Sequence, residues 1–130
     1  MFQILQHTAD VRLHVRSSSI EELFRDAMRG MFTIMQATRA GESREFRLNV
    51  DSIDRTSLLV DFLSDVLSRG QIDRAAFDDV TFAKLSQTEV EARLSGWQAR
   101  IEQDVKAVTY HEADVRFVDG EWETMLVFDI

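Results

Sequence analysis

The last four residues of the sequence, VFDI, place two negative groups next to each other. Asp129 has a side-chain carboxylate, and Ile130 carries the α-carboxylate of the chain as the sequence stands. The residues before them predict a buried strand, where two like charges would repel each other and lose solvation. A positive group is therefore expected nearby. It could be an Arg or a Lys, with Lys106 as a candidate, or a divalent cation, because Ca²⁺ and Mg²⁺ favour hard oxygen ligands.

A third carboxylate would complete the protein's share of such a cation site, but spacing alone does not say which Asp supplies it. Two groups near the N-terminus, His7 and Asp10, lie in a connection between apolar runs. His14 falls on the polar face of an alternating segment, which favours an exposed or loosely hydrogen-bonded ring. His111 ends the run VKAVTYH, and a single His at the end of a strand is usually a structural residue.

Three further Asp residues have ordinary structural explanations. Asp54 precedes a predicted helix, where its carboxylate would accept hydrogen bonds from the first turn and favour the helix dipole. Asp61 and Asp65 lie one helical turn apart and so share a face, which is more often solvated than ligating. The sequence contains no phosphate-binding loop, nucleophile elbow or HExxH metal motif.

Composition restricts the classes of function that remain. The chain has 130 residues, no cysteine and a net charge of −8, so disulfides and thiolate chemistry are excluded. A protein that binds nucleic acid by neutralising phosphates needs a basic face, so direct nucleic-acid binding is not expected. No apolar run reaches the 18 residues typical of a membrane span, and the N-terminus does not resemble a signal peptide. We therefore expect a single cytoplasmic domain over residues 1–130.

The clearest predicted element is a helix that begins at Ile20. Ser19 and Glu22 have the spacing of a capping box, and Gly41 is expected in the loop after the helix. The methionines of its apolar face could form an adaptable binding surface, but this spacing is more typical of a core. The face consists of Ile20, Leu23, Phe24, Ala27, Met28, Met31, Phe32 and Met35.

A second helix is predicted from about Arg55 to Ser68, with Gly70 as its C-terminal glycine. The remaining apolar residues alternate with period two, around residues 2–5, 11–15, 46–50, 80–82, 90–94, 113–117 and 122–128. Asp119-Gly120 indicates a two-residue hairpin. The last strand is apolar on both faces, which predicts a position inside the sheet. The expected fold is α+β: one mostly antiparallel sheet packed with two main helices.

Four segments together resemble the archease family. They are HTADV at residues 7–11, Asp54 with LLVDFL at 58–63, VKAVTYH at 105–111, and the final FDI at 128–130. The match in order and spacing runs over essentially the whole chain. It also includes the ELF of the first predicted helix, at residues 22–24. One departure concerns Arg12, which stands where a Gly commonly follows HTADV.

The resemblance implies a non-catalytic activator of an RtcB-type RNA ligase. Such proteins promote guanylylation of the ligase's active-site His, allow repeated turnover and broaden nucleotide use, in tRNA splicing or RNA repair. The resemblance also implies a divalent metal, Ca²⁺ by preference with Mg²⁺ or Mn²⁺ as alternatives. Its implied ligands are Asp10, Asp129 and Ile130, and motif positions that would contact the partner or support the site are His7, Asp54, Lys106 and His111.

Two other classes of function are alternatives to this interpretation. A general chaperone or adaptor would use the Met and Phe surface of the first helix to hold unfolded chains. A metal-dependent hydrolase would use the same carboxylates, but the sequence shows no evident general base or cluster of Arg residues near them.

Overall fold

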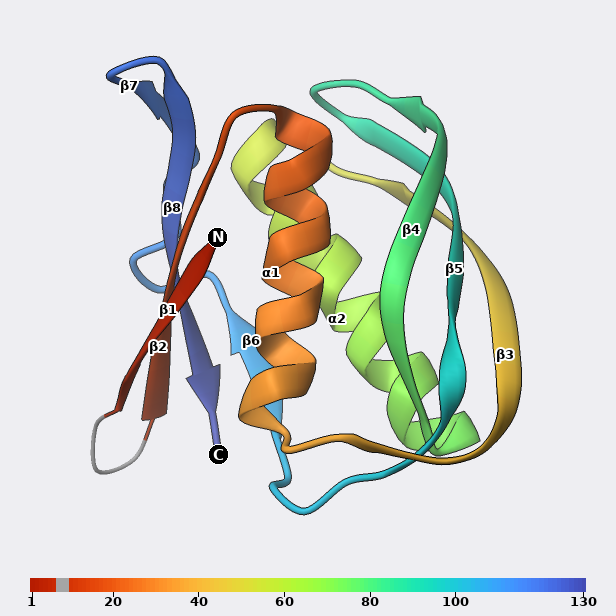
Figure 1. Ribbon diagram of the computed structural model, residues 1–130. Coiled ribbons are helices and arrows are strands. Elements are labelled where there is room, and N and C mark those ends of the chain that lie inside the picture. The colour runs from red at the N-terminus through yellow and green to blue at the C-terminus, as the bar shows by residue number, and fades with distance from the viewer. Residues whose placement is uncertain (7–9) are drawn as a thin grey trace.

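The chain forms two sheets with two helices between them, as the computed structural model shows (Figure 1). The structure describes residues 1–6 and 10–130, so the predicted site residue His7 lies outside the described residues. The elements in chain order are β1 (Phe2–Gln6), β2 (Asp10–Ser17), α1 (Ile20–Ile34), β3 (Thr38–Asp51), α2 (Arg55–Asp73), β4 (Ala75–Leu85), β5 (Glu89–Arg100), β6 (Ala107–Thr109), β7 (Arg116–Val118) and β8 (Glu121–Asp129).

The α+β class is confirmed, but the strands divide into two sheets instead of one. One sheet has the order β1-β2-β8-β6, with β7 also paired to β8, and the other has the order β3-β5-β4. Every pairing between described strands is antiparallel. Two sheets form because the helices are apolar over much of their circumference and both sides must be covered.

The interior position predicted for the last strand is confirmed. β8 pairs with β2 along one side and with β6 and β7 along the other. The hairpin before it turns at Asp119 and Gly120, whose φ angles of 51° and 79° are both positive, as a tight two-residue hairpin requires. β8, which ends in Asp129, is therefore an interior strand of the five-stranded sheet.

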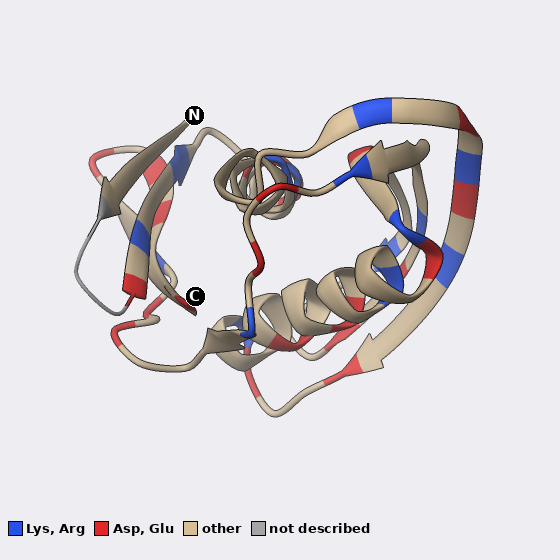
Figure 2. Cartoon of the chain, turned by 90° about the horizontal axis from the view of Figure 1, so that it is seen from below, with Lys and Arg blue, Asp and Glu red and all other residues tan. Residues whose placement is uncertain are grey.

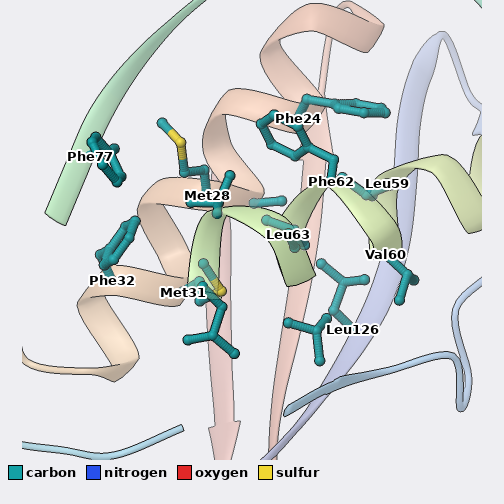
Figure 3. Close-up of a cluster of buried hydrophobic side chains, with 14 of the residues drawn as sticks. Phe24, Met28, Met31, Phe32, Leu59, Val60, Phe62, Leu63, Phe77 and Leu126 are labelled. Atoms are coloured by element: carbon teal, nitrogen blue, oxygen red, sulfur yellow. The ribbon is translucent and has the colours of Figure 1, made fainter. Parts of the chain in front are cut away.

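The methionine stripe of α1 belongs to the core, as its spacing favours. Met28, Met31 and Met35 are buried, and they pack among side chains from α2 and both sheets. Phe24 of α1 lies against Phe62 of α2, with ring centroids 5.3 Å apart (Figure 3). The helix begins at Ile20 as predicted, because the Ser19 side chain accepts a hydrogen bond from the Glu22 N–H at 3.2 Å.

Both predicted helix exits were wrong. Gly41 lies inside β3, and α1 ends at Ile34 with Met35 as its cap. Gly70 lies inside α2, which continues to Asp73 and ends at Arg74 in the left-handed conformation with φ 51°. A Cβ on Gly70 would lie 2.9 Å from a backbone oxygen of β4. This glycine therefore allows close packing of helix on strand and does not terminate the helix.

The predicted strand over residues 113–117 was only partly right. The described strand β7 is Arg116–Val118, and the three residues before it are held by other contacts. The Asp114 N–H donates to Thr124 Oγ1 at 3.0 Å, and the Val115 N–H donates to Thr56 Oγ1 at 2.9 Å. These side-chain acceptors replace the ladder partners that a longer strand would have.

We predict that Leu126→Ala lowers the free energy of unfolding by about 2–4 kcal/mol, because Leu126 is fully buried against the helices. Met125→Ala, one residue earlier on the opposite face of β8, should cost about 1 kcal/mol or less. Urea unfolding followed by circular dichroism measures both values. Equal losses for the two variants would contradict the assignment of the two faces of β8.

Candidate functional site

Asp10 and Asp129 are directly opposite each other at one end of the five-stranded sheet. Asp10 opens β2 and pairs with Asp129 at the end of β8, and Asp129 pairs in turn with Ala107 of β6. Directly opposed residues of antiparallel strands point to the same face, with Cβ atoms about 4.5–5.5 Å apart. Figure 2 shows the red start of β2 at the same end of the molecule as the C-terminus. The pairing therefore brings two sequence-predicted metal ligands together.

These two carboxylates lie on the face of the sheet that points away from the helices. Their neighbours Val11 and Phe128 are buried in the core, so alternation turns Asp10 and Asp129 outward. Asp129 is exposed and Asp10 is half-buried. Ile130 follows immediately, with its side chain packed against the core, so its α-carboxylate lies next to the outward-facing pair along the chain.

The oxygens of the pair suit a hard cation. Among the residues that the structure describes, the buried Oδ1 atom of Asp10 has no hydrogen-bond partner, and a buried carboxylate oxygen without a partner is costly. Neither Asp10 nor Asp129 makes a side-chain hydrogen bond or ion pair with a residue that the structure describes. Oxygen-only donors are the set that Ca²⁺ and Mg²⁺ prefer. The residues present therefore fit a divalent cation.

Side chains alone do not complete such a site. Within residues 1–6 and 10–130, no group of three or more His, Cys, Asp or Glu side chains could hold a metal ion. Two aspartates would thus have to be joined by the α-carboxylate of Ile130 and by water, which commonly fills the remaining positions around hard cations.

Lys106 supports the end of β8 through its backbone and not through its ammonium group. Its N–H donates to the Asp129 carbonyl oxygen at 2.8 Å. Its side chain is exposed and makes no ion pair with Asp129 or any other described residue. The lysine that the sequence offered as a counter-charge for Asp129 therefore does not act as one in this structure.

Arg12 is a cation beside the pair, and in the sequence it stands out only as a departure from the archease pattern. Its Nε donates to Glu112 Oε2 at 2.6 Å, and its second terminal nitrogen donates to Oε1 at 3.3 Å. Hydrogen bonding to Glu112 raises the pKa of the Arg12 guanidinium, and the negative charges of Glu112 and Asp10 add to this effect. The period of two along β2, which puts Asp10 and Arg12 on one face, was the signal that could have identified it.

Arg12 reaches Glu112 by crossing the outer face of β8. On the outer face of the sheet, the next row after Asp10–Asp129 consists of Arg12, Val127 and Thr109. Val127 is only 3% exposed although it faces away from the helices. The salt bridge between Arg12 and Glu112 thus connects β2 to the turn after β6. It passes over the buried Val127 and lies beside the carboxylates of Asp10 and Asp129.

The turn after β6, residues 110–112, is also held by a contact with α2. The Tyr110 hydroxyl donates to Asp61 Oδ1, and the Ser52 hydroxyl donates to Asp61 Oδ2. Asp61, expected on a solvated face of α2, is instead a half-buried acceptor for two loops. Asp65 is exposed, and partial burial followed by the charge of Asp61 raises the pKa of its carboxyl.

His111 lies between Tyr110, which donates to Asp61, and Glu112, which accepts from Arg12. Its side chain is exposed, and its backbone N–H donates to Thr109 Oγ1 at 3.3 Å. His14 has the loose contact expected of it: its Nε2 lies 3.3 Å from Glu123 Oε2. His111 is therefore presented at the surface by the same turn that Arg12 anchors.

Asp54 is not part of this cluster. It caps α2, and its Oδ1 accepts from the Ser57 N–H at 2.8 Å, as the cap interpretation predicts. The next residue, Arg55, stacks on Trp122 at 4.8 Å from the ring centroid. Trp122 lies at the start of β8, seven residues from Asp129, which at strand spacing is roughly 23 Å. Any partner contact by Asp54 would be separate from the carboxylate pair.

Comparison with known proteins shows the family. The model of the Archease protein family (MTH1598/TM1083) matches residues 2–130. The chain belongs to the archease family. It is 30% identical to the protein archease of Methanosarcina mazei, a match that covers 99% of this chain and 95% of the relative. It is 31% identical to the archease of Thermococcus gammatolerans, over 96% of this chain and 95% of the relative.

Two solved structures have the archease fold seen here. The solution structure of Methanobacterium thermoautotrophicum protein 1598 superposes with a TM-score of 0.72 at 24% identity, covering 99% of this chain and 98% of that one. A crystal structure from Thermotoga maritima, named as an archease and possible chaperone, gives a TM-score of 0.72 at 21% identity over 100% and 98%. No helix in the described part of this archease-family chain is long and apolar enough to cross a membrane.

We predict that Tyr110 ionises above the usual tyrosine pKa of about 10. Its hydrogen bond to Asp61, a small burial effect and the negative charge of Asp61 all raise its pKa. Tyr110 is the only tyrosine in the chain, so absorbance at the wavelength of tyrosinate reports on it alone. Asp61→Asn should lower the titration midpoint towards 10, and Asp65→Asn, one turn further along α2, should leave it unchanged. A wild-type midpoint at or below 10 would contradict the hydrogen bond.

Proposed function

We propose that this chain is a non-catalytic activator of an RtcB-type RNA ligase in tRNA splicing or RNA repair. It would promote guanylylation of the ligase and repeated turnover, and it would act in the cytoplasm through contact with the ligase protein. Family membership over residues 2–130 supports this proposal. The observation that carries it is the register pair of Asp10 and Asp129, which brings three motif segments of the chain to one end of one sheet.

The proposed working end is a divalent-cation site. Asp10, Asp129 and the α-carboxylate of Ile130 would hold the ion, with Ca²⁺ preferred and Mg²⁺ or Mn²⁺ as alternatives. The buried Oδ1 of Asp10, which has no hydrogen-bond partner within residues 1–6 and 10–130, supports this assignment. A bound ion would supply positive charge at this end of the five-stranded sheet, on an otherwise acidic protein. There it could adjust the positions of a partner's phosphate groups or metal ions.

Several other residues of the chain would act around this cation site. Asp129 is exposed and so accessible to a partner, and the Lys106 N–H holds its backbone in register. The Lys106 side chain and His111 are exposed and are proposed to contact the ligase, together with His7 from the segment before β2. The net charge of −8 favours a protein surface over RNA as the partner of this face.

A general chaperone remains the alternative from a different class, and the Thermotoga maritima relative is named a possible chaperone. The Met and Phe face of α1, which this alternative would use, is buried in the structure. Met28, Met31, Met35 and Phe24 are at most 1% exposed, and Phe32 is 5% exposed. The observations thus favour the ligase activator.

The proposal predicts that Asp129→Ala lowers stimulation of ligase guanylylation by roughly ten-fold or more, because even outer-shell changes at metal sites cost this much. The experiment mixes the protein with the RNA ligase of its own organism, GTP and a divalent metal, and follows the covalent nucleotide adduct over time. Adding one residue after Ile130 should have a similar effect, because it moves the α-carboxylate.

Asp119→Asn is the control, since it removes an exposed negative charge from the hairpin at the far end of β8 and keeps a residue type that tolerates the positive φ of 51° there. It should stimulate the ligase as the wild-type protein does. If wild-type protein failed to stimulate, the proposed function would be wrong. If Asp129→Ala stimulated as well as Asp119→Asn does, the Asp10–Asp129 site would not be the part of the protein that acts on the ligase.

A further inference from the structure

We propose that Arg12 sets the cation affinity of the Asp10–Asp129 site and that Glu112 moderates its effect. This inference rests on the metal site proposed above. Arg12 would weaken cation binding through its fixed positive charge, and Glu112 would strengthen binding by holding that charge away from Asp10. The two partners of one salt bridge would therefore act in opposite directions.

The first step is the position of Arg12. It stands two residues after Asp10 on β2, so the two side chains leave the same face with Cα atoms roughly 6.6 Å apart. Asp129 lies directly across from Asp10 on the adjacent strand. A cation bound between these carboxylates would lie well within one Debye length of the guanidinium at physiological salt, so the repulsion between them would be only partly screened.

The second step is the direction in which Glu112 holds Arg12. The two hydrogen bonds form a fork across β8, and the Arg12 and Glu112 side chains are 24% and 39% exposed. A guanidinium prefers such paired contacts with a carboxylate. Asp10 is an acceptor two residues away on the same face, its negative charge already acts on Arg12, and its Oδ1 has no hydrogen-bond partner among the described residues. Without Glu112, an ion pair between Arg12 and Asp10 would compete directly with the cation.

The third step is that Glu112 stands on a fixed support. It adopts a positive φ of 63°, in a turn that Tyr110 ties to α2 through Asp61. This conformation is uncommon for a non-glycine residue and costs free energy that the contacts of the turn must offset. The turn that carries Glu112 is therefore attached to α2 by the hydrogen bond between Tyr110 and Asp61, a contact that does not involve Arg12.

Direct cation binding tests the inference without any ligase. Isothermal titration with MnCl₂, and separately with CaCl₂, would compare wild-type protein with Arg12→Gln and Glu112→Gln. Arg12→Gln should bind about three- to ten-fold more tightly, the size expected for removing one charge roughly 7 Å from a divalent ion in partly screened surroundings. Glu112→Gln should bind more weakly by a similar factor. Both changes should shrink as salt is raised.

Matched controls come from the other sheet. Lys84 and Glu89 form an ion pair of 2.6 Å between β4 and β5, so Lys84→Gln and Glu89→Gln make the same changes in net charge at a distance from the site. Both controls should bind as the wild-type protein does. Arg12→Lys keeps the positive charge and should not show the tighter binding expected of Arg12→Gln, which separates the role of charge from the role of packing over Val127.

The outcomes separate this inference from the proposed site. If wild-type protein bound no cation, or if Asp129→Ala bound as well as wild type, the site itself would be wrong and the inference with it. If Asp129→Ala abolished binding but Arg12→Gln and Glu112→Gln shifted affinity in the same direction, the salt bridge would act only as a structural tie. In that case the inference alone would be overturned.

Discussion

The pairing of β8 with β2 and β6 is the constraint on which the candidate site depends. Each register pair is fixed by backbone hydrogen bonds and by the buried side chains that alternate along β8, and a shift of one residue would turn Phe128 outward and Asp129 inward. The core therefore determines which carboxylates meet at the end of the sheet. The like charges of Asp10 and Asp129 are brought together by the free energy of burying apolar residues elsewhere.

The helices make this arrangement rigid. They lie between the two sheets, so α1 and α2 bury side chains on both sides, and the aromatic rings of Phe24, Phe62 and Phe82 pack together where the layers meet. The outer face of the five-stranded sheet is then free to carry charge. Two interactions hold the turn after β6. Arg12 forms a salt bridge with Glu112, and Tyr110 donates a hydrogen bond to Asp61.

The sequence predicted those features that depend on local pattern. The capping box at Ser19, the core position of the methionines and the hairpin at Asp119-Gly120 follow from spacing within one turn or one strand. Gly41 and Gly70 were misassigned because their roles are set by packing between elements. The place of Arg12 beside Asp10 follows from the period of two along β2, but its partner Glu112 is 100 residues away, and no local pattern reports that contact.

The central claim is that a divalent cation binds where β2, β6 and β8 meet, and paramagnetic relaxation by Mn²⁺ tests it most directly. Amide signals of ¹⁵N-labelled protein would be followed while Mn²⁺ is added below one equivalent. The account predicts selective broadening at Asp10, Lys106 and Ala107, with sharp signals at Asp119 and Gly120 at the far end of β8. Broadening centred on other acidic residues, or spread evenly over the surface, would contradict it.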